Sequence, residues 1–398
     1  MHWRDRLGLN SAYFLSMAGL GFILPFFPVY LGDRGISDQT LGIIWTLAAT
    51  TSMLQIPLGR LSDRPGKRRP ILLASMMVVA VAGLVIPHVS SVLLLGFLAI
   101  VFAENGIARS LVENMSGAEA SALAKEGQEG RALSALRLYR PAGIVLVALG
   151  GGWLAEQTSL IAVFDYVIAI QAIAIFGILI MRRRQKVAPE EESQALPAVN
   201  IDGDKAIWIF IGAMVLFHAA NAPQGIYVGL YMLRDLQLPE SFVAFTFVLD
   251  MAAWMLVVMP VGWLADRFGQ RPMLFLCWIL MVVKTVMLAK VTSMELLAVA
   301  KIIDGVANGM FAVLAALWMV ERLGGRLRAG EAHAIVGTSL VFGSALGPLA
   351  TSFVVESIDY QTLFLGLGAV GFVATLFLFG VPEAHVGKPD EAEAAPSA

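Results

Sequence analysis

Six ionisable residues lie well inside long apolar stretches of the sequence. They are three acids and three bases: Glu104, Arg109, Asp250, Lys284, Lys301 and Asp304. An ionisable side chain at the middle of a bilayer costs about 2.5–3.5 kcal/mol on insertion scales, so we expect each to face a cavity or an opposite charge. A carboxyl group held beside a cation in such a place can carry a proton, because burial and the cation act on its pKa in opposite directions.

The spacing of these residues places several of them together on helix faces. One expected stripe consists of Lys301, Asp304 and Asn308, at i, i+3 and i+7. A second consists of Asn105, Arg109 and Glu113 at steps of four, with Glu104 one position around the helix. We expect Glu104 first, Asp304 second and Asp250 third as the proton carrier, and we expect the bases to supply counter-charge or bind an anionic substrate. Salt bridges that only stabilise the helices remain the alternative.

Other polar and aromatic residues extend these candidates. His218, Asn221 and Gln224 surround Pro223, which should disturb its helix. Phe26, Tyr227 and Trp254 lie next to polar residues or helix breakers, so they are the aromatic residues most expected to line a cavity. Packing between helices is the alternative for His218 and for all three aromatic side chains.

The elements that carry these residues are apolar stretches long enough to cross a membrane. Of 398 residues, 58% are hydrophobic and 15% charged, and a helix needs about 20 mostly apolar residues to span a bilayer. Twelve such stretches are expected, at 11–31, 39–58, 70–88, 90–115, 132–154, 158–181, 206–232, 240–264, 272–291, 293–320, 332–356 and 360–381. The sequence therefore predicts an all-α membrane protein with twelve transmembrane helices.

Lys and Arg fall almost entirely on one side of these stretches. With the N-terminus inside, the outer segments carry only Arg34, Arg234 and Lys290. Such a bias places both termini in the cytoplasm of a multi-pass protein in a bacterial-type inner membrane. The expected divisions are a six-helix bundle over 1–181, a polar cytoplasmic linker over 182–205, a second six-helix bundle over 206–381, and a disordered tail over 382–398.

The two halves of the chain repeat at an offset of 203 residues. The first copy of one motif is Gly59-Arg60-Leu61-Ser62-Asp63-Arg64-Pro65-Gly66-Lys67-Arg68. The second is Gly262-Trp263-Leu264-Ala265-Asp266-Arg267-Phe268-Gly269-Gln270-Arg271. Asn105-Gly106 also recurs, as Asn308-Gly309, at the same offset. Six-helix halves that repeat in this way are typical of transporters with a site at the interface between the halves.

The paired motif resembles the signature loop of the major facilitator superfamily, G-x-x-x-D-[RK]-x-G-[RK]-[RK], and the second copy departs from it only at Gln270. The resemblance covers essentially the whole chain and implies two pseudo-symmetric bundles that work by alternating access. It also implies a conformational latch formed by Gly59, Asp63, Arg64, Gly66, Arg68, Gly262, Asp266, Arg267 and Gly269. A loop that only sets membrane topology is the alternative.

Other classes of function find less support in the sequence. No phosphate-binding G-x-x-x-x-G-K-[ST] motif occurs, the five His are scattered, and Cys277 is alone. We therefore expect no enzyme, no cofactor and no metal, with a proton gradient as the energy source. The expected partners are a small organic solute and the lipid bilayer, with no nucleic acid, and the chain is expected to be a monomer.

The direction of transport stays open at this point. An exporter of amphipathic or drug-like compounds is slightly favoured by the 18 Met and 22 Phe, since flexible thioethers adapt to many shapes. Many proton-coupled drug exporters of this superfamily carry a Gly-Pro pair in the fifth span, whereas here Gly347-Pro348 lies in the eleventh. This difference counts against a drug/proton antiporter without excluding it. The alternative is a proton-coupled uptake symporter for a sugar, nucleoside or organic acid, and a more remote one is a receptor or scaffold with a transporter fold.

Overall fold

The computed structural model describes residues 3–62, 67–123, 136–181, 203–323 and 329–384. Within these ranges the chain forms helices and no strand, as the apolar stretches predict. The first half contains α1 (Trp3–Ala18), α2 (Leu20–Asp33), α3 (Asp38–Thr51), η1 (Ser52–Leu54), α4 (Gln55–Ser62), α5 (Arg68–Val85), η2 (Ile86–His88), α6 (Val92–Phe102), α7 (Ile107–Leu123), α9 (Tyr139–Gln157) and α10 (Leu160–Ile180). The second half contains α11 (Lys205–Asn221), α12 (Gln224–Leu230), η4 (Tyr231–Asp235), α13 (Glu240–Phe268), α14 (Gln270–Ala289), α15 (Met294–Arg322), α16 (Ala329–Ser352), α17 (Tyr360–Phe377) and η6 (Leu378–Gly380).

Ten helical segments of the described chain are long and apolar enough to cross a membrane. They correspond to ten of the twelve predicted spans. The other two predicted spans, 39–58 and 132–154, coincide with α3 to α4 and with α9, which are helical but are not among these ten segments.

Two predicted spans contain breaks at residues that matter for the site. The span predicted over 90–115 is present, but it is not one continuous helix, because α6 ends at Phe102 and α7 begins at Ile107. Gly106 makes this break possible: a Cβ there would lie only 2.7 Å from the carbonyl oxygen of Ile100. The predicted disturbance at Pro223 is confirmed, since α11 ends at Asn221 and α12 begins at Gln224.

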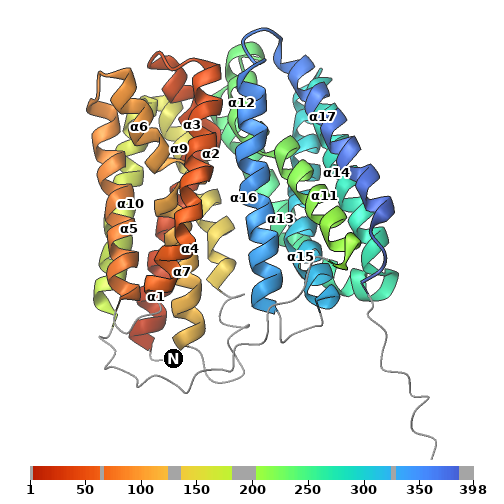
Figure 1. Ribbon diagram of the computed structural model, residues 1–398. Helices are drawn as coiled ribbons and strands as arrows, with labels where there is room; N and C mark the ends of the chain where they lie inside the picture. Colours follow the sequence, from red (N-terminus) through yellow and green to blue (C-terminus); the bar gives the residue numbers. More distant parts are fainter. Residues whose placement is uncertain (1–2, 63–66, 124–135, 182–202, 324–328, 385–398) are drawn as a thin grey trace, which may run out of the picture.

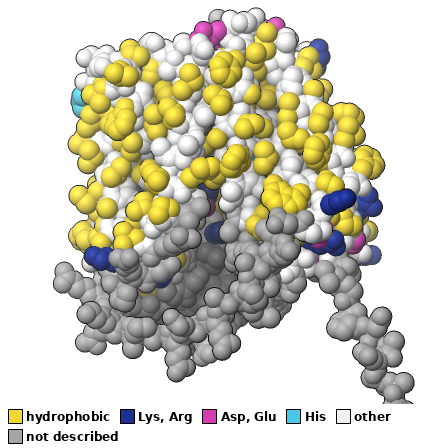
Figure 2. Space-filling model, in the orientation of Figure 1, with side chains coloured by type: hydrophobic (Ala, Val, Ile, Leu, Met, Phe, Trp, Pro, Cys, Tyr) yellow, Lys and Arg dark blue, Asp and Glu magenta, His cyan; other side chains and the backbone are white. Residues whose placement is uncertain are grey.

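The two halves of the helix bundle converge at one end and separate towards the other (Figure 1). We call the end with the N-terminus and with Arg68 and Arg322 the basic end, and the end with Asp38 and Arg234 the opposite end. Helix α3 packs on α16, α9 on α13, and α2 on α12. Figure 2 shows the surface hollowed between the halves towards the basic end, where grey atoms cover part of the view.

The buried apolar side chains follow the same division. One hydrophobic cluster combines residues of α1 to α10 with parts of α12 to α17 near the opposite end, such as Tyr227, Phe247 and Phe364. A second cluster contains only residues of the second half, such as Trp278 and Trp318. The apolar contact between the halves is therefore concentrated at the opposite end.

Polar contacts close the opposite end as well. We call Asp38 of α3 together with Tyr227, Arg234 and Tyr360 of the second half the opposite-end clasp. Arg234 Nη1 lies 3.1 Å from Asp38 Oδ1, and the Tyr227 hydroxyl donates to the Asp38 backbone carbonyl at 3.1 Å. The Tyr360 hydroxyl donates to the other carboxylate oxygen of Asp38. Every one of these bonds crosses from one half to the other.

Helix ends at the basic end are held by side chains. Asp204 caps the start of α11 by accepting from the Ala206 amide at 2.9 Å. Arg322 Nε, at the end of α15, donates to the other Asp204 oxygen at 2.7 Å. The hydrogen bond from Arg322 is the main reason why the pKa of Asp204 lies below its usual range.

Candidate functional site

Four of the six charges singled out from the sequence meet inside the second half. We call Asp250 of α13, Lys284 of α14, and Lys301 and Asp304 of α15 the four-charge cluster. Their exposed fractions are 6%, 1%, 4% and 7% respectively. All four lie within segments apolar enough to span a membrane, so each charge needs a partner of opposite sign.

The charges of the cluster alternate in sign along a chain of short contacts. Lys284 Nζ lies 2.7 Å from Asp304 Oδ1, and Lys301 Nζ lies 2.8 Å from Asp304 Oδ2. Lys301 Nζ also lies 2.9 Å from Asp250 Oδ2. The net charge of the cluster is therefore zero when all four groups are ionised. The stripe of Lys301, Asp304 and Asn308 predicted from the sequence is present, with all three side chains in contact on α15.

Amide side chains continue this network towards α11 and α12. Lys284 Nζ donates to Asn221 Oδ1 at 2.7 Å, Asn221 Nδ2 donates to Asn308 Oδ1 at 2.9 Å, and Asn308 Nδ2 donates to Asp304 Oδ1 at 2.8 Å. Gln224 Nε2 donates to the Thr285 hydroxyl at 3.1 Å. Within the described residues, Gln224 Oε1 is buried and has no hydrogen-bond partner. Three amides predicted as polar cavity residues thus lie in or beside the cluster.

Close approach of α13 and α15 brings the charges together. A Cβ at Gly305 would lie 2.0 Å from the Asp250 carbonyl oxygen, and a Cβ at Gly309 would lie 2.4 Å from Val257. A larger residue at Gly305 would need the α13 backbone to shift, and one at Gly309 would need the Val257 side chain to move. The two glycines therefore set the distance at which Lys301 can reach Asp250.

The two carboxylates of the cluster are not equivalent. Asp304 contacts both lysines and also accepts from Asn308. Asp250 contacts Lys301 alone, and its Oδ1 is buried without a partner among the described residues. A proton on Asp250 would leave Lys301 paired with Asp304, whereas a proton on Asp304 would weaken two ion pairs. The geometry thus favours Asp250 over Asp304 as the group that exchanges a proton.

A second cation shared by two acids lies in the first half. Arg140 of α9 contacts Glu113 of α7 at 2.7 Å and Glu104, in the turn before α7, at 3.0 Å. The side chains of Arg140, Glu104 and Glu113 are 31%, 24% and 31% exposed, so they are more accessible than the four-charge cluster. Sequence reasoning missed Arg140 as a partner of Glu104. The available signal was a basic residue inside a predicted span, 132–154.

Arg109 and Asn105 do not join Glu104 as the predicted stripe required. Arg109 Nε donates to the Phe102 carbonyl and Nη1 to the Ser16 carbonyl, each at 3.2 Å. Its guanidinium also lies over the Phe102 ring, 5.2 Å from the centroid. Asn105 lies in the turn between α6 and α7, because the helix is interrupted there.

The remaining predicted cavity residues are distributed through the bundle. His218 is buried against the rings of Phe217 and Phe311. Phe26 is fully buried, Tyr227 belongs to the opposite-end clasp, and Trp254 is partly buried on α13. Within the described part of the chain, no group of three or more His, Cys, Asp or Glu side chains could hold a metal ion.

The residues of the predicted latch are described only in part. Asp63, Arg64 and Gly66, the side chain of Asp266 and the surroundings of Gly59 in α4 lie outside the described residues. Arg68 contacts Glu119 at 3.9 Å. Gly269 has a φ of 87°, and a Cβ there would lie 3.2 Å from Glu383, whose carboxylate accepts from the Arg271 amide at 3.2 Å. Arg267 lies over the rings of Trp263 and Phe268, and a Cβ at Gly262 would meet no atom within 4 Å.

Comparison with known proteins gives a family and several relatives. A model of the MFS_1 like family matches residues 7–366. The multi-drug resistance efflux pump PmrA of Streptococcus pneumoniae serotype 4 is 23% identical over 380 residues, which cover 92% of each chain. The multidrug resistance protein MdtG of Escherichia coli O9:H4 is 23% identical over 370 residues, which cover 88% of each chain.

Solved structures show the same fold at lower identity. The nucleoside transporter NupG superposes with a TM-score of 0.79 and 15% identity, over 96% of this chain and 99% of the other. A POT family transporter in complex with a thioalcohol-conjugated peptide superposes with a TM-score of 0.70 and 12% identity, over 94% of each chain.

Proposed function

We propose, from the premise that this chain belongs to the MFS_1 like family of the major facilitator superfamily, that it is a proton-coupled secondary transporter which exports amphipathic organic compounds. Transport of a small solute by alternating access follows from the family. Proton coupling, direction and substrate class are the further steps of the proposal. Two relatives named as multidrug efflux proteins, which align over most of their length, support export.

The observation that carries the coupling step is the four-charge cluster. Burying four charges in membrane-spanning helices is costly even when they pair, and a well-packed apolar core would serve stability at least as well. A proton on Asp250 changes the net charge of the cluster from zero to +1 while Lys301 keeps Asp304 at 2.8 Å. A proton on Asp250 and a cationic substrate close to the cluster would then disfavour each other electrostatically, which is the requirement for exchange.

The separation of the halves at the basic end supports one state of an alternating-access cycle. Among the described residues, the opposite-end clasp and the packing of α3 on α16 join the halves at the opposite end. If the basic end faces the cytoplasm, as the Lys and Arg distribution predicts, this state accepts substrate from inside the cell. An inner-membrane location with cytoplasmic termini is part of the same proposal.

Uptake of a nucleoside-like solute is the second candidate. The fold neighbour NupG is titled a nucleoside transporter, and the network offers hydrogen-bonding amides, including the unpartnered oxygen of Gln224. These groups suit a polar solute with donors and acceptors. The direction of proton movement separates this candidate from export.

The test uses everted membrane vesicles acidified by respiration, with a pH-sensitive dye inside. Lipophilic cations, antibiotics, nucleosides, sugars and organic acids are added to vesicles with and without the protein. Export coupled to protons requires that some compound releases luminal protons only when the protein is present. A panel without any such compound contradicts export, and substrate-driven proton uptake in intact cells would then favour the symporter.

Variants locate the coupling step once a compound is found. Asp250→Asn should abolish compound-driven proton release while binding of the compound persists. Glu295→Gln is the matched control, because Glu295 is an exposed acid in the first turn of α15 and takes no part in the cluster. If Asp250→Asn keeps the wild-type pH dependence and Glu104→Gln loses it, the proton is carried in the first half instead.

A further inference from the structure

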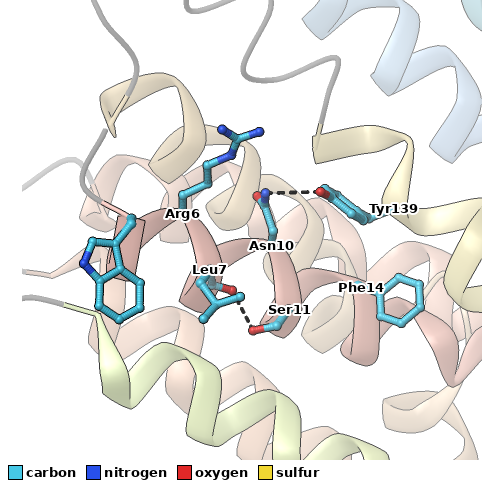
Figure 3. A pocket seen from close by; sticks show the side chains of 7 residues that line it. Arg6, Leu7, Asn10, Ser11, Phe14 and Tyr139 are labelled. Atoms are coloured by element: carbon cyan, nitrogen blue, oxygen red, sulfur yellow. Dashed lines mark hydrogen bonds between the residues drawn. The ribbon is translucent and has the colours of Figure 1, made fainter.

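A pocket of about 520 Å³ lies against α1 at the basic end, apart from the four-charge cluster. It is lined by Trp3, Arg6, Leu7, Asn10, Ser11 and Phe14 of α1 and by Tyr139 of α9 (Figure 3). Its volume falls in the range of small-molecule sites, about 300–1,000 Å³. Nothing in the proposed transport step uses this pocket.

The pocket has apolar walls and one polar edge. Phe14 packs edge-on against Tyr139, with ring centroids 6.3 Å apart, and Leu7 and Trp3 continue the apolar wall. Asn10 Nδ2 lies 3.4 Å from the Tyr139 hydroxyl, and the Ser11 hydroxyl donates to the Leu7 carbonyl at 2.7 Å. A ligand here would meet mainly carbon atoms, together with the Asn10 and Tyr139 side chains.

The surroundings of the pocket are apolar and exposed. Trp3 and Leu7 are 66% and 58% exposed, and Leu138, directly before Tyr139, is 43% exposed. Helix α10 packs on α1 beside the pocket, where a Cβ at Gly8 would lie 2.5 Å from the Gly177 carbonyl. The outward side of α10 presents Phe176, which is 62% exposed. In a membrane, surfaces of this kind contact lipid, and Trp is enriched where chains meet headgroups.

Among the described residues that line the pocket, Arg6 is the only charged one. It is exposed, and no ion pair of Arg6 is found among the described residues. The described part of the lining contains no carboxylate, so an organic cation finds no counter-charge in it. A cation at the rim of an apolar pocket beside the acyl region matches a molecule with an anionic head and a hydrocarbon chain.

We propose that this pocket binds an anionic phospholipid from the leaflet at the basic end. The phosphate oxygens contact Arg6, with Asn10 and the Tyr139 hydroxyl as further donors. The upper part of one acyl chain lies against Leu7, Trp3 and Phe14. Anionic lipids attract single basic side chains near the membrane surface by about 1 kcal/mol each, which corresponds to about five-fold in affinity.

The experiment is native mass spectrometry of the delipidated full-length protein in detergent, titrated with phosphatidylglycerol or phosphatidylcholine. We expect the wild type to hold one phosphatidylglycerol more tightly than phosphatidylcholine, and Arg6→Gln to weaken that binding about five-fold. Arg4→Gln is the matched control, because Arg4 is the same residue type two positions away and does not line the pocket. Equal effects of the two variants would show a diffuse attraction to basic residues and would overturn the proposal.

Two further arms identify which part of the lipid is recognised. Phosphatidylglycerol with brominated chains should quench Trp3 fluorescence, seen as the difference between wild type and Trp3→Phe, and no difference contradicts the position of the chain. Glycerol 3-phosphate should not displace the lipid, and displacement would show a site for a soluble anion instead. These measurements need no transport substrate, so either result leaves the proposed transport function to its own test.

Discussion

Replacing Lys301 by Met should destabilise the second half more than any other single exchange in the four-charge cluster. Lys301 is the only partner of Asp250 among the described residues, at 2.9 Å, and Asp250 is 6% exposed. Met keeps most of the side-chain volume and removes the charge, so Asp250 is left buried without compensation. Removing one member of a buried ion pair costs about 3–5 kcal/mol. Asp304 still keeps Lys284 at 2.7 Å.

The assay is thermal unfolding of the purified protein in detergent, followed by intrinsic fluorescence. At roughly 2–4 °C per kcal/mol for a domain the size of one half, the midpoint should fall by about 10 °C. The double variant Lys301→Met with Asp250→Asn should recover more than half of that loss, because the remaining pair of Lys284 and Asp304 is neutral. Lys301→Met with Asp304→Asn should recover none, since it isolates Asp250 and also removes the partner of Lys284. Equal recovery in both double variants would refute the assignment of partners.

Three further predictions concern other parts of the bundle. Arg234→Gln removes the ion pair with Asp38 in the opposite-end clasp; because the pair is partly exposed, the equilibrium between conformations should shift only a few-fold. Longer distances between spin labels on the two halves at that end would show this shift, and an unchanged distribution would contradict it. The pKa of Asp204 is lowered from 3.8 in the folded protein, so Asp204 stabilises the fold above that pH and the contribution is lost as the pH falls through the folded-state pKa. The difference in unfolding midpoint between wild type and Asp204→Asn should therefore vanish in acid, and a difference that persists there would refute the cause. Gly305→Ala should destabilise the protein by about 1–3 kcal/mol, because the new Cβ meets the Asp250 carbonyl. The control Gly366→Ala, whose Cβ would have no atom within 4 Å, should be neutral or stabilising. Similar unfolding midpoints for the two variants would refute the close approach of α13 and α15.

Much of the candidate site was predictable where the pattern is local. Lys301, Asp304 and Asn308 are on one helix, and their spacing alone predicted that their side chains share a face. The prediction failed at Asn105 and Arg109, because the same reasoning assumed a continuous helix and the chain breaks at 103–106. The turn is stabilised by close backbone packing around Gly106, which periodicity does not report.

The pairing of charges depends on contacts between distant segments. Sequence reasoning named Asp250, Lys284 and Lys301 as buried charges, but it did not predict that Lys301 bridges Asp250 and Asp304 while Lys284 pairs with Asp304. It also ranked Glu104 without its partner Arg140. Which side chains pair depends on how each helix is rotated about its axis and on the close approach of α13 and α15 that Gly305 and Gly309 permit.

The sequence by itself determined the class of this protein, because bilayer thickness dictates the length of each apolar span and loop charges bias its topology. It also determined which ionisable residues cost free energy in the bilayer unless they face an opposite charge or a cavity. Only the tertiary structure decided which partner each charge has and at which end the two halves meet. Both depend on packing between helices that are far apart in the chain. There, a single Cβ in place of a glycine hydrogen changes which side chains can touch.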